Sequence, residues 1–190
     1  MVAVVEVSEL TCQRDGRELF GALGFELNAG ECLEVRGANG SGKSTLLRCV
    51  AGLFTDYAGT IETASSLYLG HRLGLNLLLT AEQNLMWYRG LRGSADSISE
   101  VLSRVGMGGY ARVSCQNMSA GQQRRIGLAR VLIGQCPLWL LDEPLTALDA
   151  TGQELVASLI QEHLQASGAV LCATHQDLQV PGARTLQLGV

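Results

Sequence analysis

The sequence predicts an α/β domain with a mostly parallel sheet core and a helical insertion. Short apolar runs alternate with helical patterns along the chain, which is typical of a largely parallel sheet. Residues from about 72 to 118 hold helical patterns without convincing strands, so a helical segment is expected to interrupt the sheet. A length of 190 residues corresponds to one compact domain. We therefore expect a single domain over 1–190 with its insertion at about 72–118.

The expected elements follow one another in a regular order. Strands are predicted where short apolar runs occur, at residues 2–7, 32–36, 66–69, 138–141 and 169–173. Helices are predicted from their apolar period, at residues 44–52, 80–91, 97–105, 121–134 and 150–167. Three helix starts carry capping boxes, in which a hydroxyl and the third-following side chain satisfy backbone donors, at Thr80, Ser97 and Ser119.

Composition excludes several classes of protein. Apolar residues make up 47% and charged residues 17%, which favours a buried core over disorder. A net charge of −4 does not indicate a nucleic-acid partner. The six cysteines are scattered without a C-x-x-C motif, which indicates buried thiols in a reducing compartment rather than zinc ligands. No apolar run approaches the roughly 18 residues of a membrane helix, so membrane contact is expected only through partners.

A phosphate-binding motif lies between the strand at 32–36 and the helix that follows it. Residues 37–44 match G-x-x-x-x-G-K-[ST] in the context that a P-loop requires. Glycines let successive amides face a phosphate, while the lysine reaches its oxygens and the serine ligates Mg²⁺. A glycine-rich turn with a chance lysine is the structural alternative. The predicted nucleotide-binding residues are Gly37, Ala38, Asn39, Gly40, Ser41, Gly42, Lys43, Ser44 and Thr45.

An acid pair ends the apolar run at 138–141. Asp142 and Glu143 are expected at the C-terminal edge of the parallel sheet, where ligands bind in such folds. Asp142 would hold Mg²⁺ together with Ser44, and Glu143 would polarise the attacking water as a general base. The alternative is a pair that caps the turn before Pro144, which the upstream P-loop makes the weaker interpretation.

A third motif decides the class of P-loop protein. Residues 118–123 read Met-Ser-Ala-Gly-Gln-Gln at a predicted helix start. Here the sequence resembles an ABC-type ATPase, with Ala120 in place of the second glycine of the usual signature. A serine hydroxyl and free amides at a helix start can bind a phosphate. The resemblance implies that Ser119 and Gly121 contact the ATP of a second subunit, in a head-to-tail homodimer.

Further landmarks of the ABC family fall in the expected order. Asp149, in Ala147-Leu148-Asp149, matches the D-loop, and His175 matches the switch histidine that contacts the γ-phosphate. Arg14 stands where relatives place an adenine-stacking aromatic, and a guanidinium plane can stack on a base. His71 takes the slot where relatives place a glutamine that serves Mg²⁺ and the transporter contact.

Several segments narrow the resemblance within the ABC family. The chain resembles the ATP-binding subunit of the cytochrome c maturation system, also called the haem exporter ATPase. That resemblance implies ATP and Mg²⁺ as cofactors, small polytopic membrane subunits as partners and a peripheral position on the cytoplasmic face of the inner membrane. The segments that carry it are Tyr68-Leu69-Gly70-His71, Leu79-Thr80-Ala81-x-x-Asn84-Leu85, the signature and Pro137-Leu138-Trp139.

Two alternative functions would use the same hydrolytic residues. The first is the ATPase subunit of an ABC transporter for another substrate, which only its partner would distinguish. The second is a soluble ABC ATPase that acts on nucleic acid or ribosomes. Such proteins usually carry two cassettes or a long coiled coil, and neither fits in 190 residues. Three basic residues would favour it, but on a helix they fit a solvated face or a contact with the partner better: Arg124, Arg125 and Arg130.

Overall fold

The computed structural model describes residues 3–14 and 16–189, which form two compact units. The first unit contains the described part of residues 1–68 with Cys136–Glu143 and the described part of residues 157–190. The second unit, called the helical unit below, contains Leu69–Gln135 and Pro144–Val156. Val2, the start of the first predicted strand, lies outside the described residues.

A parallel sheet forms the centre of the first unit, as predicted. Strand β3 pairs in parallel with β7 and β8, and β6 pairs in parallel with β7. Strands β6 and β7 are buried along their whole length, which explains why their sequences are continuously apolar. The strand order is β5 (Ser66–Leu69), β6 (Leu138–Asp142), β7 (Ala169–Ala173), β3 (Cys32–Arg36) and β8 (Arg184–Gln187).

A second, antiparallel sheet was not predicted and corrects the sequence interpretation. Its order is β2 (Arg17–Asn28), β1 (Ala3–Arg14) and β4 (Ala58–Thr63), so the first strand runs well beyond residue 7. Register shifts interrupt the pairing of β1 with β2, and this breaks the regular alternation that marks a strand in sequence. Strand β4 is exposed almost throughout, and β8, also unpredicted, is short and polar.

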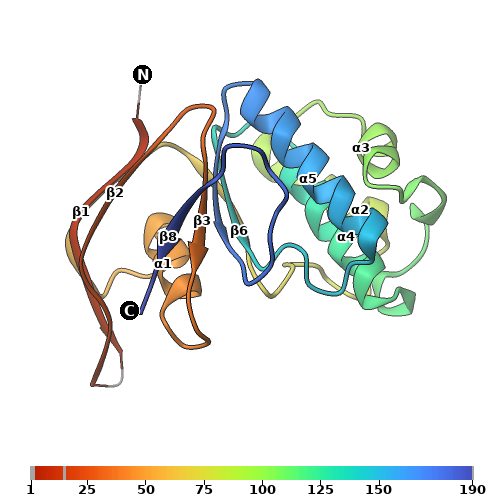
Figure 1. Ribbon diagram of the computed structural model, residues 1–190. Helices are drawn as coiled ribbons and strands as arrows, with labels where there is room; N and C mark the ends of the chain where they lie inside the picture. Colours follow the sequence, from red (N-terminus) through yellow and green to blue (C-terminus); the bar gives the residue numbers. More distant parts are fainter. Residues whose placement is uncertain (1–2, 15, 190) are drawn as a thin grey trace. The chain divides into compact units, whose positions relative to one another are not determined.

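Helix α1 (Lys43–Val50) lies between the antiparallel and parallel sheets (Figure 1). It contacts β4 on one side and β6 and β7 on the other. Leu46 and Leu47 are completely buried in the core that these elements share. Burial of each leucine contributes about 1.5–3 kcal/mol, so the helix that begins at the P-loop is held firmly.

The helical unit is built from α2 (Ala81–Arg92), α3 (Ile98–Arg104) and α4 (Ala120–Leu132), which contact one another. Short 3-10 turns, η1 (Gly108–Tyr110) and η2 (Cys115–Asn117), precede α4. The capping boxes at Thr80 and Ser119 are confirmed. At Ser97 one of the two hydrogen bonds of the predicted box is present, from the Glu100 amide to the Ser97 hydroxyl. Helix α5 (Ala150–Gln165) begins in this unit and ends in the first.

The cysteines are buried thiols, as the sequence predicts. Cys12, Cys32, Cys49, Cys115 and Cys172 are buried, and Cys136 is half-buried. Burial raises the pKa of Cys32 and of Cys49 to about 12, so these thiols are poor nucleophiles. Within residues 3–14 and 16–189, helices of the length and apolarity that a membrane crossing requires are absent.

Candidate active site

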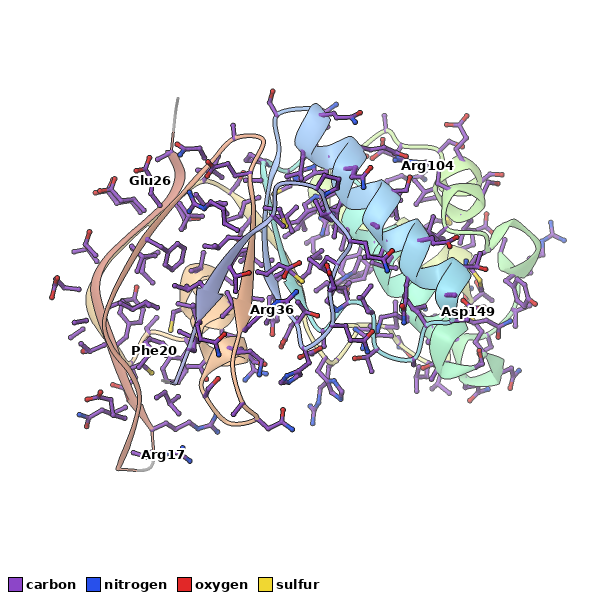
Figure 2. The ribbon with its side chains drawn as sticks, in the orientation of Figure 1. Arg17, Phe20, Glu26, Arg36, Arg104 and Asp149 are labelled. Atoms are coloured by element: carbon purple, nitrogen blue, oxygen red, sulfur yellow. The ribbon has the colours of Figure 1, made fainter. Side chains whose placement is uncertain are left out.

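The P-loop adopts a backbone that requires glycine. Gly37, Gly40 and Gly42 have φ values of 154°, 82° and 96°. A Cβ atom on Gly37 would lie 2.5 Å from the Leu188 carbonyl oxygen, and one on Gly42 would lie 2.9 Å from Cδ1 of Phe20. Figure 2 shows Phe20 on β2, on the same hairpin as Arg17. The predicted loop is therefore a tight turn in which side chains at Gly37 and Gly42 would collide with their neighbours.

The loop presents groups that suit an anion. The Lys43 ammonium donates to the carbonyl oxygens of Gly37 and Ala38, at 2.8 and 3.1 Å, and so is held across the loop. The Ser41 hydroxyl is buried and has no hydrogen-bond partner among the described residues. The first amides of α1 lack partners within the helix, as at every helix start. A phosphate would satisfy all these groups together.

Ser44 and Asp142 meet at the C-terminal edge of the parallel sheet. The Ser44 hydroxyl donates to Oδ1 of Asp142 at 2.9 Å. Mg²⁺ is usually held by one or two protein oxygens together with phosphate oxygens, and this pair fits that pattern. Over the described ranges, His, Cys, Asp and Glu side chains do not gather into a group of three that could hold a metal. A cation here would therefore need the oxygens of a bound nucleotide.

Two further residues belong to this site and were missed in the sequence. The Tyr68 hydroxyl donates to Oδ2 of Asp142 at 3.1 Å, and Nε of Arg48 donates to the Tyr68 oxygen at 3.4 Å. Burial, together with the Asp142 charge, raises the pKa of Tyr68, so the phenol stays protonated and can donate. Ser44 and Arg48 are four residues apart on α1, and this spacing was the available signal.

Glu143 and His175 lie side by side where β6 and β7 end. Oε1 of Glu143 is 3.3 Å from Nε2 of His175, and the two side chains are 24% and 45% exposed. This oxygen is buried without a hydrogen-bond partner among the described residues, so it retains the capacity to accept one. Glu143 has φ of 52°, a conformation that costs a non-glycine residue about 1 kcal/mol. Such strain is typical of functional sites.

A buried carboxylate fixes the loop that carries His175. Glu34 on β3 is 3% exposed, and it accepts from the Leu178 amide at 3.4 Å and from Nε of Arg36 at 2.8 Å. Because β3 leads directly into the P-loop, Glu34 links the P-loop to the loop that carries His175. Glu34 carried no signal in the sequence because it stands alone in an apolar strand.

Arg14 ends β1, and its side chain is exposed. It pairs in register with Arg17 on β2, and this hairpin also carries Leu19 and Phe20, which lie beside Gly42. The hairpin thus borders the P-loop. The contact of Arg14 with adenine stays a prediction.

The helical unit contains the other predicted residues. The Ser119 hydroxyl accepts from the Gln122 amide at 3.2 Å and caps α4. A Cβ atom on Gly121 would lie 2.8 Å from the Ala147 carbonyl oxygen, so the signature and the predicted D-loop touch through bare backbone. Asp149 accepts from the Gly152 amide at 2.8 Å, which caps α5, and lies 3.3 Å from the Arg125 guanidinium.

The predicted site residues therefore fall into two sets. The P-loop, Asp142, Glu143, His175 and Arg14 lie in the first unit. His71, which is exposed in the segment after β5, lies in the helical unit with Ser119, Gly121 and Asp149.

Comparisons with known proteins identify the family of the chain. A family model described as "ABC transporter" matches residues 20–146. The cytochrome c biogenesis ATP-binding export protein CcmA of Saccharophagus degradans is 41% identical, over 94% of this chain and 90% of that protein. The protein of the same name from Pseudomonas putida is 41% identical, over 100% of this chain and 98% of that protein.

Solved structures agree with the fold. The structure of an ATP-binding subunit of an ABC transporter covers 90% of this chain and 79% of its own, with a TM-score of 0.82 and 20% identity. This likeness confirms the predicted fold class. The chain is an ABC-type ATPase, and it belongs to the family of the cytochrome c biogenesis ATP-binding export protein CcmA.

Proposed function

We propose that this ATPase is the ATP-hydrolysing subunit of an ABC complex for cytochrome c biogenesis. Hydrolysis would drive haem export or the release of a haem-loaded chaperone. The observation that carries the proposal is the 41% identity, over 98% or more of both chains, with a relative whose name states cytochrome c biogenesis. The catalytic groups described above supply the chemistry.

The P-loop would bind and stabilise the phosphates of ATP. Lys43 and the loop amides would face the β and γ oxygens, where negative charge develops during transfer. Ser44 and Asp142 would hold Mg²⁺, which neutralises charge on the β- and γ-phosphates when bound. Both residues are already in contact at 2.9 Å, so little rearrangement of this chain is needed.

Glu143 would act as the general base. Water attacks the γ-phosphorus, the bond to the ADP oxygen breaks, and Oε1 of Glu143 takes the proton of the water. His175, 3.3 Å away, would donate to the γ-phosphate and keep the carboxylate in place. The products are ADP and inorganic phosphate.

A second copy of the chain would complete each site. The Ser119 oxygen accepts from Gln122, which leaves the hydroxyl proton available for the γ-phosphate of the partner's ATP. Gly121 adds no side chain that would obstruct this approach. Asp149, which caps α5, would support the same interface.

Membrane partners would receive the conformational change. We propose small polytopic subunits as these partners, with the ATPase peripheral on the cytoplasmic face of the inner membrane and His71 at the contact. A nucleic-acid partner is not proposed, because the chain carries a net charge of −4. Arg14 would contact the adenine base.

Complementation tests the proposal. The chain would be expressed in Pseudomonas putida lacking its own CcmA, with haem-stained c-type cytochromes as the readout and the wild-type host and empty vector as references. Pull-down from membranes would identify bound subunits. Restored cytochromes with co-purified polytopic subunits are expected. As a control, the CcmA of the host would be expressed from the same vector and should restore the cytochromes. If this control works and the purified chain hydrolyses ATP, but the chain does not restore the cytochromes, the biogenesis assignment is wrong.

A further inference from the structure

We propose that Tyr68 and Arg48 are positioning residues that hold the Asp142 carboxylate ready for the metal ion. The inference rests on the proposed role of Ser44 and Asp142 as the metal-holding pair. It assigns a function to two residues that belong neither to the P-loop nor to the acid pair of Asp142 and Glu143.

The carboxylate of Asp142 is held at both oxygens. Oδ1 accepts from Ser44 at 2.9 Å, and Oδ2 accepts from Tyr68 at 3.1 Å. Asp142 is 1% exposed, so water contributes little to fixing its orientation. Because the two bonds reach different oxygens, the side chain cannot rotate without breaking one of them.

Both bonds are connected to the P-loop helix α1, one directly and the other through a second residue. Ser44 and Arg48 stand one turn apart on the same side of α1. Ser44 reaches Asp142 directly, whereas Arg48 reaches it through Tyr68, which comes from the neighbouring strand β5. The arrangement therefore ties α1, β5 and β6 together at the carboxylate.

The direction of these hydrogen bonds is determined by chemistry. A guanidinium can only donate, so the Tyr68 oxygen accepts from Arg48 and its single proton points to Asp142. A positive donor on the phenol oxygen makes the phenol a stronger donor to the carboxylate. The Tyr68 bond also holds Oδ2 independently of Ser44, so Asp142 stays oriented when the Ser44 oxygen is shared with a metal ion. Partners of this kind around a metal ligand typically change metal affinity by 10–100-fold.

Metal titration separates positioning from general stability. The purified protein would be titrated with Mn²⁺ in the presence of ATP, with free Mn²⁺ followed by electron paramagnetic resonance, and metal-free ATP binding would be measured in EDTA. Tyr68→Phe is expected to weaken Mn²⁺ binding by about tenfold. Its metal-free ATP affinity should stay at the wild-type value, whereas loss of a hydrogen bond to the buried carboxylate should lower the melting temperature. Tyr57→Phe is the matched control, because Tyr57 packs against the same core and is not among the residues around Asp142.

A double mutant tests whether Arg48 acts through Tyr68. Arg48→Met should weaken Mn²⁺ binding less than Tyr68→Phe, and the double variant should be no weaker than Tyr68→Phe alone. Any of three results would overturn the inference. Tyr68→Phe could bind Mn²⁺ like the wild type, it could lose metal-dependent and metal-free ATP binding equally, or the effects of the two changes could add in the double variant.

Asp142→Asn separates this inference from the proposed metal site. If Asp142→Asn binds Mn²⁺ like the wild type, the metal assignment itself is wrong. If Asp142→Asn loses Mn²⁺ while Tyr68→Phe retains it, the inference about Tyr68 and Arg48 fails and the metal assignment stands.

Discussion

Oε1 of Glu143 lies 3.3 Å from Nε2 of His175, although the two residues follow different strands. The parallel register explains the contact, because Asp142 on β6 pairs with Ala173 on β7. The segments after β6 and β7 therefore leave the sheet at the same edge, and the Glu143 amide donates to the Ala173 carbonyl at 2.8 Å. The sheet thus brings a candidate base and its histidine partner together at the edge where Asp142 and Ser44 also meet.

His175→Ala should slow ATP hydrolysis by about 100-fold, because one donor to the transferring phosphate is lost. ATP affinity should change little, since the P-loop supplies most phosphate contacts. Steady-state phosphate release and binding of a fluorescent ATP analogue measure the two quantities. An equal loss of binding and hydrolysis would assign His175 to nucleotide binding instead.

Ser119→Arg should lower hydrolysis by about 100-fold while each chain still binds ATP. The bulky cation would occupy the space proposed for the partner's γ-phosphate. Analytical ultracentrifugation with ATP should show fewer dimers than the wild type forms.

Ser97→Arg is the matched control, because Ser97 also caps an exposed helix start in the helical unit. Loss of either cap costs about 1 kcal/mol of stability, so Ser97→Arg reproduces that effect alone. Wild-type hydrolysis by Ser119→Arg would show that the site needs no second copy.

His163 should make stability depend on pH. Its ring stacks on Trp139 with centroids 3.9 Å apart, and its buried Nε2 has no hydrogen-bond partner among the described residues. Burial lowers the pKa of His163 below its usual value of 6.5. As the pH falls below about 6.5, the unfolded chain therefore gains a proton that the folded chain does not, and the free energy of unfolding decreases.

Urea unfolding at pH 7.5 and pH 5.5 tests this dependence. His163→Phe keeps an aromatic ring against Trp139 and cannot titrate, so it should lose less stability between these pH values than the wild type. An identical loss in both proteins would assign the pH dependence to other groups. Gly168→Ala should be destabilising by about 1–3 kcal/mol at both pH values, because its Cβ would overlap the His163 ring.

His71→Ala should leave ATP binding by the isolated chain intact but lower hydrolysis in the membrane complex by about tenfold. The reason is that His71 is proposed to contact the membrane subunits, which the isolated chain lacks. Arg72→Ala, a change at the neighbouring exposed residue, is the control. Full cytochrome c maturation with His71→Ala would place the coupling contact elsewhere in the helical unit.

The P-loop and the buried parallel strands could be predicted because their signals are local. Gly37 and Gly42 stand at backbone positions that only glycine occupies easily, and Asp142 ends a strand whose other residues are all apolar. The antiparallel strands β2 and β4 were missed because their residues are largely exposed and their pairing is irregular. Such strands depend on cross-strand neighbours, which a single sequence does not reveal.

Tyr68 and Arg48 could not be found by the same reasoning. Tyr68 was noted only as part of a segment that carries the family resemblance, and its contact with Asp142 depends on β5 and β6 being neighbours. The roles of Arg14 and His71 stay predictions, because each lies on an exposed segment whose partners are a nucleotide and another protein.

ATP turnover by Glu143→Gln tests the central claim most directly. The purified variant, the wild type and Glu154→Gln, an exposed acid on α5 changed in the same way, would be compared for ATP binding and phosphate release. We predict that Glu143→Gln binds ATP with wild-type affinity, hydrolyses it at least about 100-fold more slowly and accumulates as an ATP-bound dimer. Hydrolysis by Glu143→Gln at the rate of Glu154→Gln would contradict the assignment of Glu143 as the base.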